Sequence, residues 1–145
     1  MNRMVPVIGW KEWAALPDLN IPRLKVKMDT GARTSALHTY FIEPFVKDGK
    51  EMVRFGVHPL QKTDDPSIIC EAQVIDKRRI KNTGGQKEVR YIISTNIKMG
   101  EKLFPLELSL ANRDAMLFRM LVGRTALKGR FVIDPSKIHT LDAAG

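Results

Sequence analysis

The sequence reads Val26-Lys27-Met28-Asp29-Thr30-Gly31-Ala32 at the end of a run that alternates basic and apolar residues. That run, 23–28, has the pattern of a half-buried strand, so Asp29 stands where the strand ends. Gly31 permits a tight turn that a Cβ would obstruct. Backbone donors in such a turn orient a carboxylate, and the Thr30 hydroxyl can bond to a neighbouring loop. Alone the motif is weak evidence of chemistry, because Asp-initiated turns after strands are common.

A second motif lies near the other end of the chain. The sequence there reads Met120-Leu121-Val122-Gly123-Arg124-Thr125-Ala126-Leu127. It predicts an apolar strand over 120–122, then a Gly-Arg pair, then a helical turn over 125–128. The two motifs stand at opposite ends of a chain whose intervening pattern is that of strands.

Short β-prone runs separated by turn signals predict a mostly all-β domain with one or two short helices. We expect strands at 3–10, 23–28, 36–46, 52–57, 68–80, 88–97, 103–110, 120–122 and 131–133. Asp48-Gly49 predicts a hairpin turn between the third and fourth of these. Gly84-Gly85 lies in the tip of a longer hairpin between the fifth and sixth. We also expect an irregular or helical connector over 11–20, and Asn112 as the N-cap of a short helix.

The length of 145 residues and the hydrophobic fraction of 43% predict a single domain over 1–145, with a loosely held tail over 136–145. No apolar run approaches the length of a membrane span, and the segment 4–10 is too short and Pro-broken for a secretory signal. One cysteine, Cys70, cannot form an internal disulfide and fits a reducing compartment. We therefore expect a cytoplasmic protein in which Cys70 is a small buried hydrophobe.

The formal net charge is +8, which attracts anionic partners such as nucleic acid, acidic lipid or acidic polypeptide. The densest basic run is Lys77-Arg78-Arg79 with Lys81. The few aromatic residues are not interleaved with it, so a nucleic-acid platform is poorly supported. We favour an acidic polypeptide as the partner; the alternative is an evenly charged surface with a basic excess.

The Asp29-Thr30-Gly31-Ala32 turn with a downstream Gly123-Arg124 pair resembles the retropepsins. These enzymes combine an apolar-Asp-Thr-Gly-Ala loop with a later apolar-apolar-Gly-Arg element. The resemblance is closer still to one bacterial family of that superfamily, which is named for an ATP-dependent zinc protease. It covers nearly the whole chain and rests on residues 9–13, 27–38, 112–114, 123–127 and 131–135.

The resemblance implies a retropepsin-like closed β-barrel and roles for particular residues. Asp29 would be the catalytic carboxylate. Its loop would be supported by Thr30, Gly31, Ala32, Gly123 and Arg124, although Arg124 has a surface helix cation as its alternative. A flap tip would be formed by Thr83, Gly84 and Gly85, with a plain hairpin turn as the alternative. Viral retropepsins usually carry an acidic residue in the stretch that reads Arg33-Thr34-Ser35 here. Arg33 near the active-site loop would favour acidic substrates.

The family resemblance also implies partners. Members are associated with ATP-grasp ligases that add glutamate to a ribosomal protein, and some are thought to trim such glutamate tails. The expected substrate is therefore an acidic or glutamate-extended polypeptide. The stretch between the two motifs is longer than in viral retropepsins, so an extra hairpin must be accommodated.

Aspartic chemistry needs two carboxylates in contact, which share one proton because like charges cannot both ionise there. One Asp-Thr-Gly per chain predicts a homodimer that places Asp29 against its own copy. This mechanism needs neither metal nor cofactor. The sequence has no Gly-rich phosphate loop and no His-Glu-x-x-His pair, and its histidines are far apart, without the spacing of a metal site. They are His38, His58 and His139.

Two other functions stay open. One is a non-catalytic dimeric β-barrel module that binds or regulates a partner such as a glutamate ligase, because a fold does not dictate a function. The other is a zinc-dependent protease. We expect Asp114 and Asp134 to be capping or turn residues.

Overall fold

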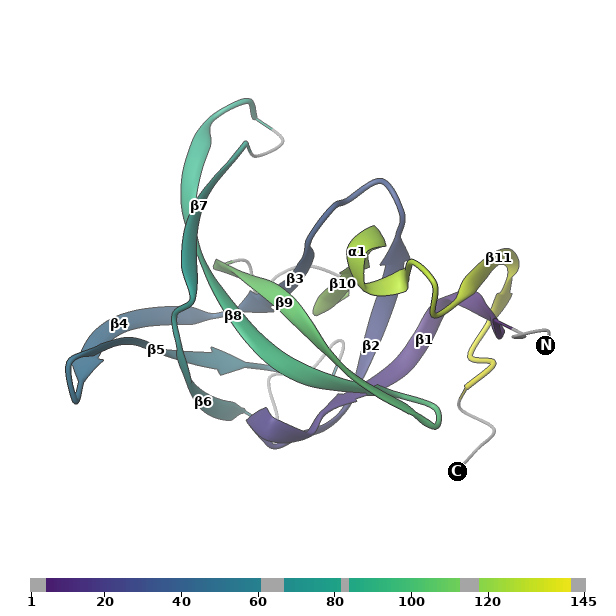
Figure 1. Ribbon diagram of the computed structural model, residues 1–145, viewed down its shortest axis with the longest axis horizontal. Helices are drawn as coiled ribbons and strands as arrows, with labels where there is room; N and C mark the ends of the chain where they lie inside the picture. Colours follow the sequence, from purple (N-terminus) through teal and green to yellow (C-terminus); the bar gives the residue numbers. More distant parts are fainter. Residues whose placement is uncertain (1–4, 61–66, 82–83, 113–117, 142–145) are drawn as a thin grey trace.

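The computed structural model describes residues 5–60, 67–81, 84–112 and 118–141. The chain is built almost entirely of strands (Figure 1). They are β1 (Val7–Leu16), β2 (Ile21–Asp29), β3 (Ser35–Thr39), β4 (Phe41–Lys47), β5 (Lys50–Val57), β6 (Ile68–Gln73), β7 (Asp76–Lys81), β8 (Lys87–Met99), β9 (Lys102–Asn112), β10 (Met120–Gly123) and β11 (Val132–Ile138). The helical elements are a 3-10 turn, η1 (Pro17–Leu19), and α1 (Arg124–Leu127). The mostly all-β prediction is confirmed.

The larger sheet has 8 strands in the order β11-β1-β2-β10-β3-β9-β8-β7. It curls into a near-barrel ring (Figure 1) because Ala15 of β1 also pairs with Lys98 of β8. β10 comes late in the chain but lies between β2 and β3, parallel to β2 and antiparallel to β3. The two sequence motifs are therefore neighbours in space, with Gly123 at the end of β10 opposite Asp29 at the end of β2.

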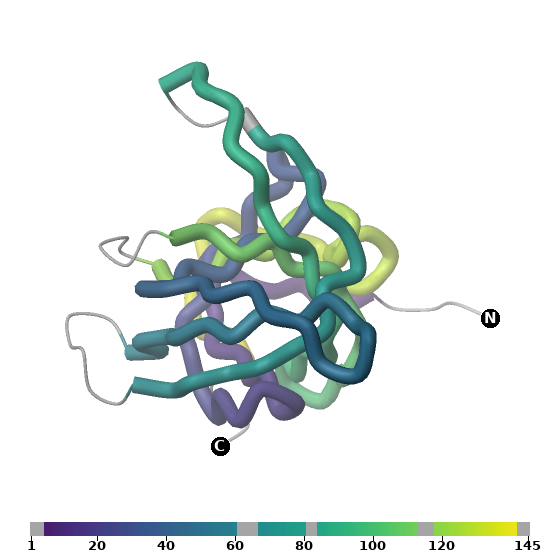
Figure 2. Tube along the Cα trace, turned by 90° about the vertical axis from the view of Figure 1, so that its left-hand side faces the viewer, coloured from purple at the N-terminus to yellow at the C-terminus, as the bar shows by residue number. Residues whose placement is uncertain are grey.

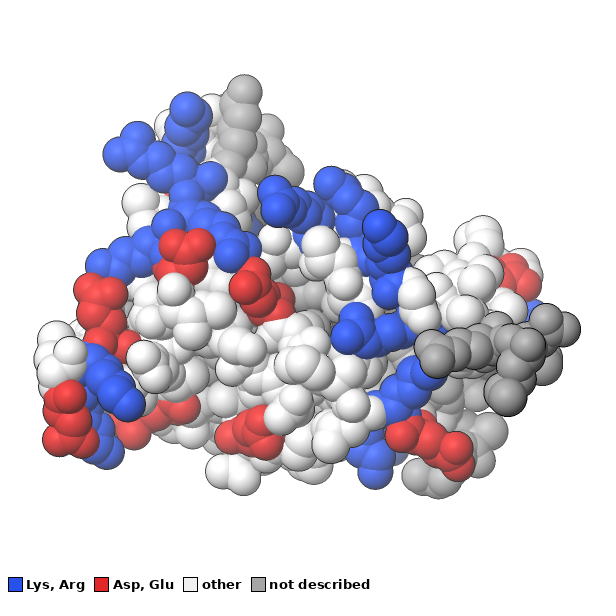
Figure 3. Space-filling model, in the orientation of Figure 1, with Lys and Arg blue, Asp and Glu red and all other residues white. Residues whose placement is uncertain are grey.

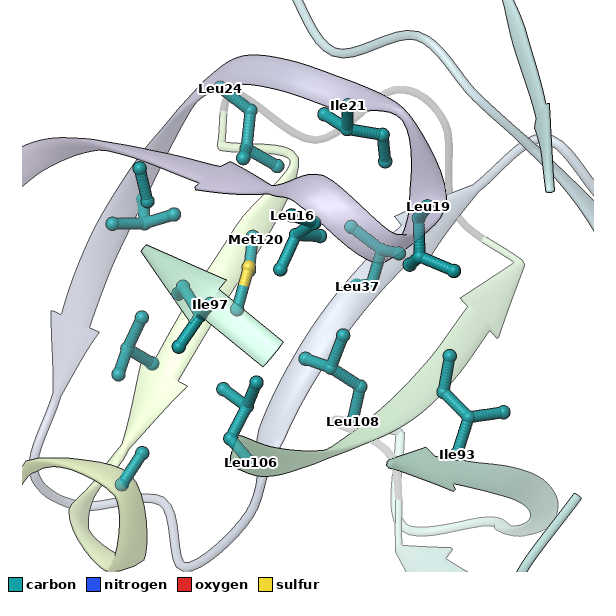
Figure 4. Close-up of a cluster of buried hydrophobic side chains, with 14 of the residues drawn as sticks. Leu16, Leu19, Ile21, Leu24, Leu37, Ile93, Ile97, Leu106, Leu108 and Met120 are labelled. Carbon is teal, nitrogen blue, oxygen red and sulfur yellow. The ribbon is translucent and has the colours of Figure 1, made fainter. Parts of the chain in front are cut away.

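Aliphatic side chains fill the inside of the ring (Figure 4). Strand β2 shows how the sequence produces this arrangement, because its alternation predicts which face each side chain takes. Leu24, Val26 and Met28 are buried, whereas Arg23 and Lys27 are exposed. Each large aliphatic side chain that is fully buried contributes about 1.5–3 kcal/mol to folding. The buried core residues labelled in Figure 4 are Leu16, Leu19, Ile21, Leu24, Leu37, Ile93, Ile97, Leu106, Leu108 and Met120.

The smaller sheet contains β4, β5 and β6. Asp48 and Gly49 form the predicted β4–β5 turn, and both have positive φ. The other predicted hairpin is corrected, because its first arm changes sheet in the middle. The Val74 amide donates to the Glu51 carbonyl, whereas the next amide, Ile75, donates to the Ile92 carbonyl. Residues 68–73 therefore pair with β5, and only 76–81 pair with β8.

The β7–β8 hairpin stands clear of the body of the molecule in both views (Figures 1 and 2). The side chains of β8 change from buried to exposed at the point where the hairpin leaves the body. Ile92 and Ile93 are fully buried, whereas Lys87 and Val89, closer to the tip, are exposed. The hairpin is thus anchored at its root and surrounded by solvent beyond it.

Two further predictions are corrected, and a third, the Asn112 cap, stays untested. The connector expected over 11–20 is strand as far as Leu16, because β1 pairs with β2 along this stretch; only Pro17–Leu19 is helical. Asn112 ends strand β9, and the helix it was expected to cap falls on 113–117, outside the described residues. The tail from residue 136 is held as far as Leu141, because β11 continues to Ile138 and the amides of Thr140 and Leu141 donate to Glu12.

Candidate active site

Asp29 ends β2 and begins a tight turn. The Ala32 amide donates to the Asp29 carbonyl at 3.1 Å and closes the turn. The Gly31 amide donates to the Asp29 carboxylate, with a distance of 3.2 Å to Oδ1. Asp29 is only partly buried, so the backbone orients the carboxylate while one side of it stays accessible. A Cβ on Gly31 would lie 3.4 Å from that oxygen, an ordinary contact, and Gly31 does not have a positive φ. The expectation that a Cβ would obstruct this turn is therefore corrected, and the contribution of Gly31 within the described chain is its backbone amide.

The loop after Asp29 is held by the Gly-Arg motif. The amides of Arg124 and Thr125 donate to the carbonyls of Ala32 and Arg33 at 2.8 and 3.3 Å. The Arg124 guanidinium donates to the Gly31 carbonyl at 3.0 Å. The exposed Arg124 side chain thus bonds to the Asp29 loop within its own chain.

Two hydroxyl groups complete this arrangement, and the sequence analysis assigned no role to either. The Thr125 hydroxyl donates to the Arg33 carbonyl at 2.7 Å. The buried Ser35 hydroxyl accepts the Gly123 amide at 3.0 Å. Both residues lie inside stretches that carry the family resemblance, and that was the only signal that pointed to them.

The backbone of Gly123 lies in close contact with the backbone of the Asp29 loop. Its φ of −86° and ψ of 171° suit any residue, so the requirement for glycine is steric. A Cβ at this position would lie 2.9 Å from the Ala32 carbonyl oxygen, 2.9 Å from the Thr34 carbonyl carbon and 3.0 Å from the Arg33 carbonyl oxygen. These are backbone atoms, so the loop itself would have to move.

Gly123→Ala is therefore expected to destabilise the protein by about 1–3 kcal/mol, the usual cost of overpacking a close contact. It should also displace the Asp29 loop and lower any activity that depends on it by about tenfold or more. Thermal unfolding and a hydrolysis assay on the same preparation would check both effects. Full activity at unchanged stability would show that the loop does not depend on this contact.

Arg33 opens onto a pocket of about 380 Å³ beside the Asp29 loop. The walls come from the loop (Arg33, Thr34), the root of the β7–β8 hairpin (Arg78, Ser94), β9 and α1. Arg78 is held by Glu107 and Asp76 at 2.8 and 2.9 Å. The exposed Arg33 side chain makes no ion pair among the described residues. Lys and Arg side chains gather over the hairpin and beside α1 (Figure 3).

The expected flap tip is only partly described. Gly84 and Gly85 form the exposed turn of the β7–β8 hairpin, and Gly85 has a φ of +82° that favours glycine. Thr83 lies outside the described residues. The root of the same hairpin lines the pocket beside the Asp29 loop, so a flap role for this hairpin stays a prediction.

Cys70 and Asp134, two further residues considered in the sequence, make structural contacts. Burial raises the pKa of Cys70 to about 11, and its thiol contacts the Leu19 carbonyl at 3.4 Å. Cys70 is thus the small buried residue that was expected. Asp134 lies inside strand β11, where its carboxylate accepts bonds from the amide and hydroxyl of Ser136, whereas Asp114 lies outside the described residues.

The histidines occupy separate surroundings. Nδ1 of His38 lies 2.7 Å from the Phe118 carbonyl, His58 stacks on Tyr40, and His139 packs near Trp13. In the part of the chain that the structure describes, no three His, Cys, Asp or Glu side chains are grouped closely enough to hold a metal ion. The described helices also include none that is long and apolar enough to span a bilayer.

The sheet order and the clasped Asp-Thr-Gly turn agree with a comparison of whole sequences. Residues 7–143 match the model of the RimB-like family, described as the retropepsin-like aspartic endopeptidase RimB. The chain belongs to this family. A crystal structure from Legionella pneumophila, of a protein with unknown function, has the same fold: its TM-score is 0.75 and its sequence is 31% identical, over 94% of this chain and 98% of that one.

Curated relatives carry a different name. A "Probable alpha-L-glutamate ligase" of Desulfotalea psychrophila is 47% identical over 90% of this chain, and one of Parasynechococcus marenigrum is 44% identical over 97%. The match covers only 28% and 30% of those proteins. This RimB-like chain thus spans less than a third of the length of the curated relatives it matches.

Proposed function

We propose that this chain is an aspartic endopeptidase that works as a homodimer and hydrolyses peptide bonds with a water molecule held by two Asp29 carboxylates. The observation that carries the proposal is the Asp29-Thr30-Gly31 turn, clasped by Gly123-Arg124 with one face of the carboxylate accessible. Membership of a retropepsin-like family supports the same chemistry.

The chemistry requires a second carboxylate. Each chain supplies one Asp-Thr-Gly, so a two-fold dimer would place one Asp29 against its copy. The two groups share a proton. The ionised member accepts a proton from the attacking water, and the protonated member polarises the scissile carbonyl and then helps to protonate the leaving amine. The loop contacts made by Gly31 and Arg124 would keep each carboxylate oriented for this exchange.

The proposed substrate is an acidic or glutamate-extended polypeptide. Its support is the net charge of +8, the basic side chains over the hairpin and beside α1 (Figure 3), and the position of Arg33 in the lining of a pocket next to the Asp29 loop. Positive charge around a cleft raises the local concentration of an anionic substrate and its rate of capture.

A second candidate is a module that binds or regulates a glutamate ligase without catalysis. The curated relatives favour it, because they are named as glutamate ligases and contain a region like this chain within less than a third of their length. The first candidate would hydrolyse a glutamate-extended polypeptide, and the second would bind the ligase that adds glutamate. They differ in whether Asp29 performs chemistry. The zinc protease stays a third alternative, distinguished by its sensitivity to a chelator.

The test is hydrolysis of a glutamate-tailed protein, compared with the same protein without its tail, in the presence and absence of a chelator. We expect the tail to be cleaved, the chelator to have no effect, and the rate to fall as salt is raised from low to high, because salt screens the attraction. Inhibition by the chelator would support the zinc protease. No cleavage of the tail would support the binding module, and a salt-independent rate would contradict steering.

A further inference from the structure

Lys27 lies on the same face of β2 as Asp29. Side chains two positions apart on a strand point the same way and lie about 7 Å apart along it. Met28, between them, is buried in the core, while Lys27 is exposed and Asp29 is partly exposed. The Lys27 ammonium group therefore projects beside the carboxylate that the proposed reaction uses.

A second ammonium group belongs to the residue paired with Lys27 on the neighbouring strand. Lys11 of β1 is the antiparallel partner of Lys27, and like charges directly opposite each other destabilise a sheet. Lys11 lies 5.5 Å from the centre of the Trp10 ring, which gives its charge a favourable contact. Within the described residues Lys27 has no ion pair and no ring contact. The pair thus forms a positive site that lacks its own anion.

The surroundings limit what this site can bind. On the other side of Lys27 its neighbour is Leu121 of β10, which is partly buried, and Gly123 follows opposite Asp29. A ligand that lies on this face of the sheet meets a leucine, two ammonium groups and the Asp29 carboxylate within a few residues of strand. An extended peptide has the repeat to match. A bare anion would leave Leu121 uncovered.

We propose that Lys27, with Lys11 opposite it, binds the side-chain carboxylate of a substrate residue next to the scissile bond, so that this site selects glutamate at that position. The inference rests on the proposed peptidase function and makes it more specific. It assigns the selectivity for acidic substrate to one position beside Asp29, in addition to the general attraction of a basic surface. Lys27 is a specificity residue here and takes no part in bond breaking.

Lys25 provides a matched control. It lies on the same strand and the same face, one pair farther from Asp29, and its ammonium group lies 5.2 Å from the centre of the Trp13 ring. Lys25→Gln and Lys27→Gln remove the same charge from the same strand. A difference between them therefore reports the position of the charge and excludes a change of net charge as the cause.

The experiment measures binding in the Asp29→Asn protein, which does not require hydrolysis. Fluorescent glutamate and glutamine hexapeptides are titrated into this protein and into its double variants with Lys27→Gln or Lys25→Gln. We expect glutamate to be preferred, and the preference to fall by about tenfold with Lys27→Gln, the loss of one charge-assisted contact. With Lys25→Gln it should change by less than about twofold.

The outcomes separate the two proposals. Equal losses with both lysine variants, or no preference for glutamate at the start, would overturn the Lys27 site. A selective loss with Lys27→Gln supports it even if the wild-type protein hydrolyses neither peptide, and in that case only the peptidase proposal fails. Charge reversal gives a second check, because Lys27→Glu should turn the preference toward a lysine hexapeptide. Lys27 is exposed, so these variants should unfold at the same temperature as their parent.

Discussion

Asp29→Asn should abolish the hydrolysis of glutamate-tailed protein, with a loss of about 10²–10⁴-fold or more. The physical reason is that an amide cannot accept the proton of the attacking water, and general acid–base catalysis of this kind supplies a factor of that size. The fold should not suffer, because Asn is close to Asp in size and the Asp29 side chain is only partly buried. The measurement is the initial rate of tail release, followed by mass spectrometry, alongside thermal unfolding.

Asp48→Asn is the matched control for this substitution. Asp48 sits in the exposed β4–β5 turn with a φ of +53°, a conformation that Asn accepts readily. The same chemical change there should leave the rate unaltered. Unimpaired hydrolysis by Asp29→Asn would exclude the aspartic mechanism.

Mixing the two kinds of chain tests the homodimer. If two Asp29 carboxylates form one active centre, equal amounts of wild-type and Asp29→Asn chains that exchange freely leave about a quarter of the dimers with both carboxylates. At equal total protein, the rate of the mixture should therefore be about a quarter of the wild-type rate. If each chain worked alone, the rate would be about half, set only by the amount of wild-type chain.

The largest stability effect is expected at Glu12. This side chain is 0% exposed, yet its carboxylate accepts bonds from the amides of Gly9, Thr140 and Leu141 at 2.7, 3.0 and 2.9 Å, and from the Thr140 hydroxyl at 2.7 Å. It ties the segment after β11 to the start of β1. Glu12→Ala would leave these donors without their acceptor and should cost about 3–5 kcal/mol.

Chemical denaturation at neutral pH would measure this loss, with Glu43→Ala as the control. Glu43 is exposed on β4, and substitutions at such positions change stability by about 0.5 kcal/mol or less. Equal effects of the two substitutions would show that the Glu12 bonds contribute nothing particular.

The contribution of Glu12 should depend on pH. Burial alone would raise its pKa, but the bonds from Leu141, Thr140 and Gly9 outweigh burial, and the net pKa lies below the ordinary value of 4.5. A pKa lowered by folding means that the stabilisation is fully present above the unfolded-state value and is lost as the pH falls through the folded-state value. The difference between wild type and Glu12→Ala should therefore be constant near neutral pH and should shrink in acid.

Several features could be read from short stretches of sequence because their causes are local. The alternation in 23–28 correctly predicted which β2 residues are buried, and the Asp48-Gly49 turn follows from the backbone freedom of its residues. The Asp29 turn also has local bonds, from the Gly31 amide to the carboxylate and from the Ala32 amide to the Asp29 carbonyl. The errors share a different cause. The end of β1, the change of sheet after Gln73 and the attachment of Leu141 all depend on partners from other parts of the chain.

By itself, the sequence determined the strand character, the turn that carries Asp29, the buried faces and the family to which the chain belongs. Only the tertiary structure decided that β10 lies between β2 and β3, so that Arg124 reaches the Gly31 carbonyl 93 positions away. The pairing of β1 with β2 set Lys11 opposite Lys27, and the bonds from Thr140 and Leu141 enclosed Glu12. The physical reason is that local patterns specify backbone conformation and burial, whereas the choice of strand neighbours comes from hydrogen bonds and packing between distant segments.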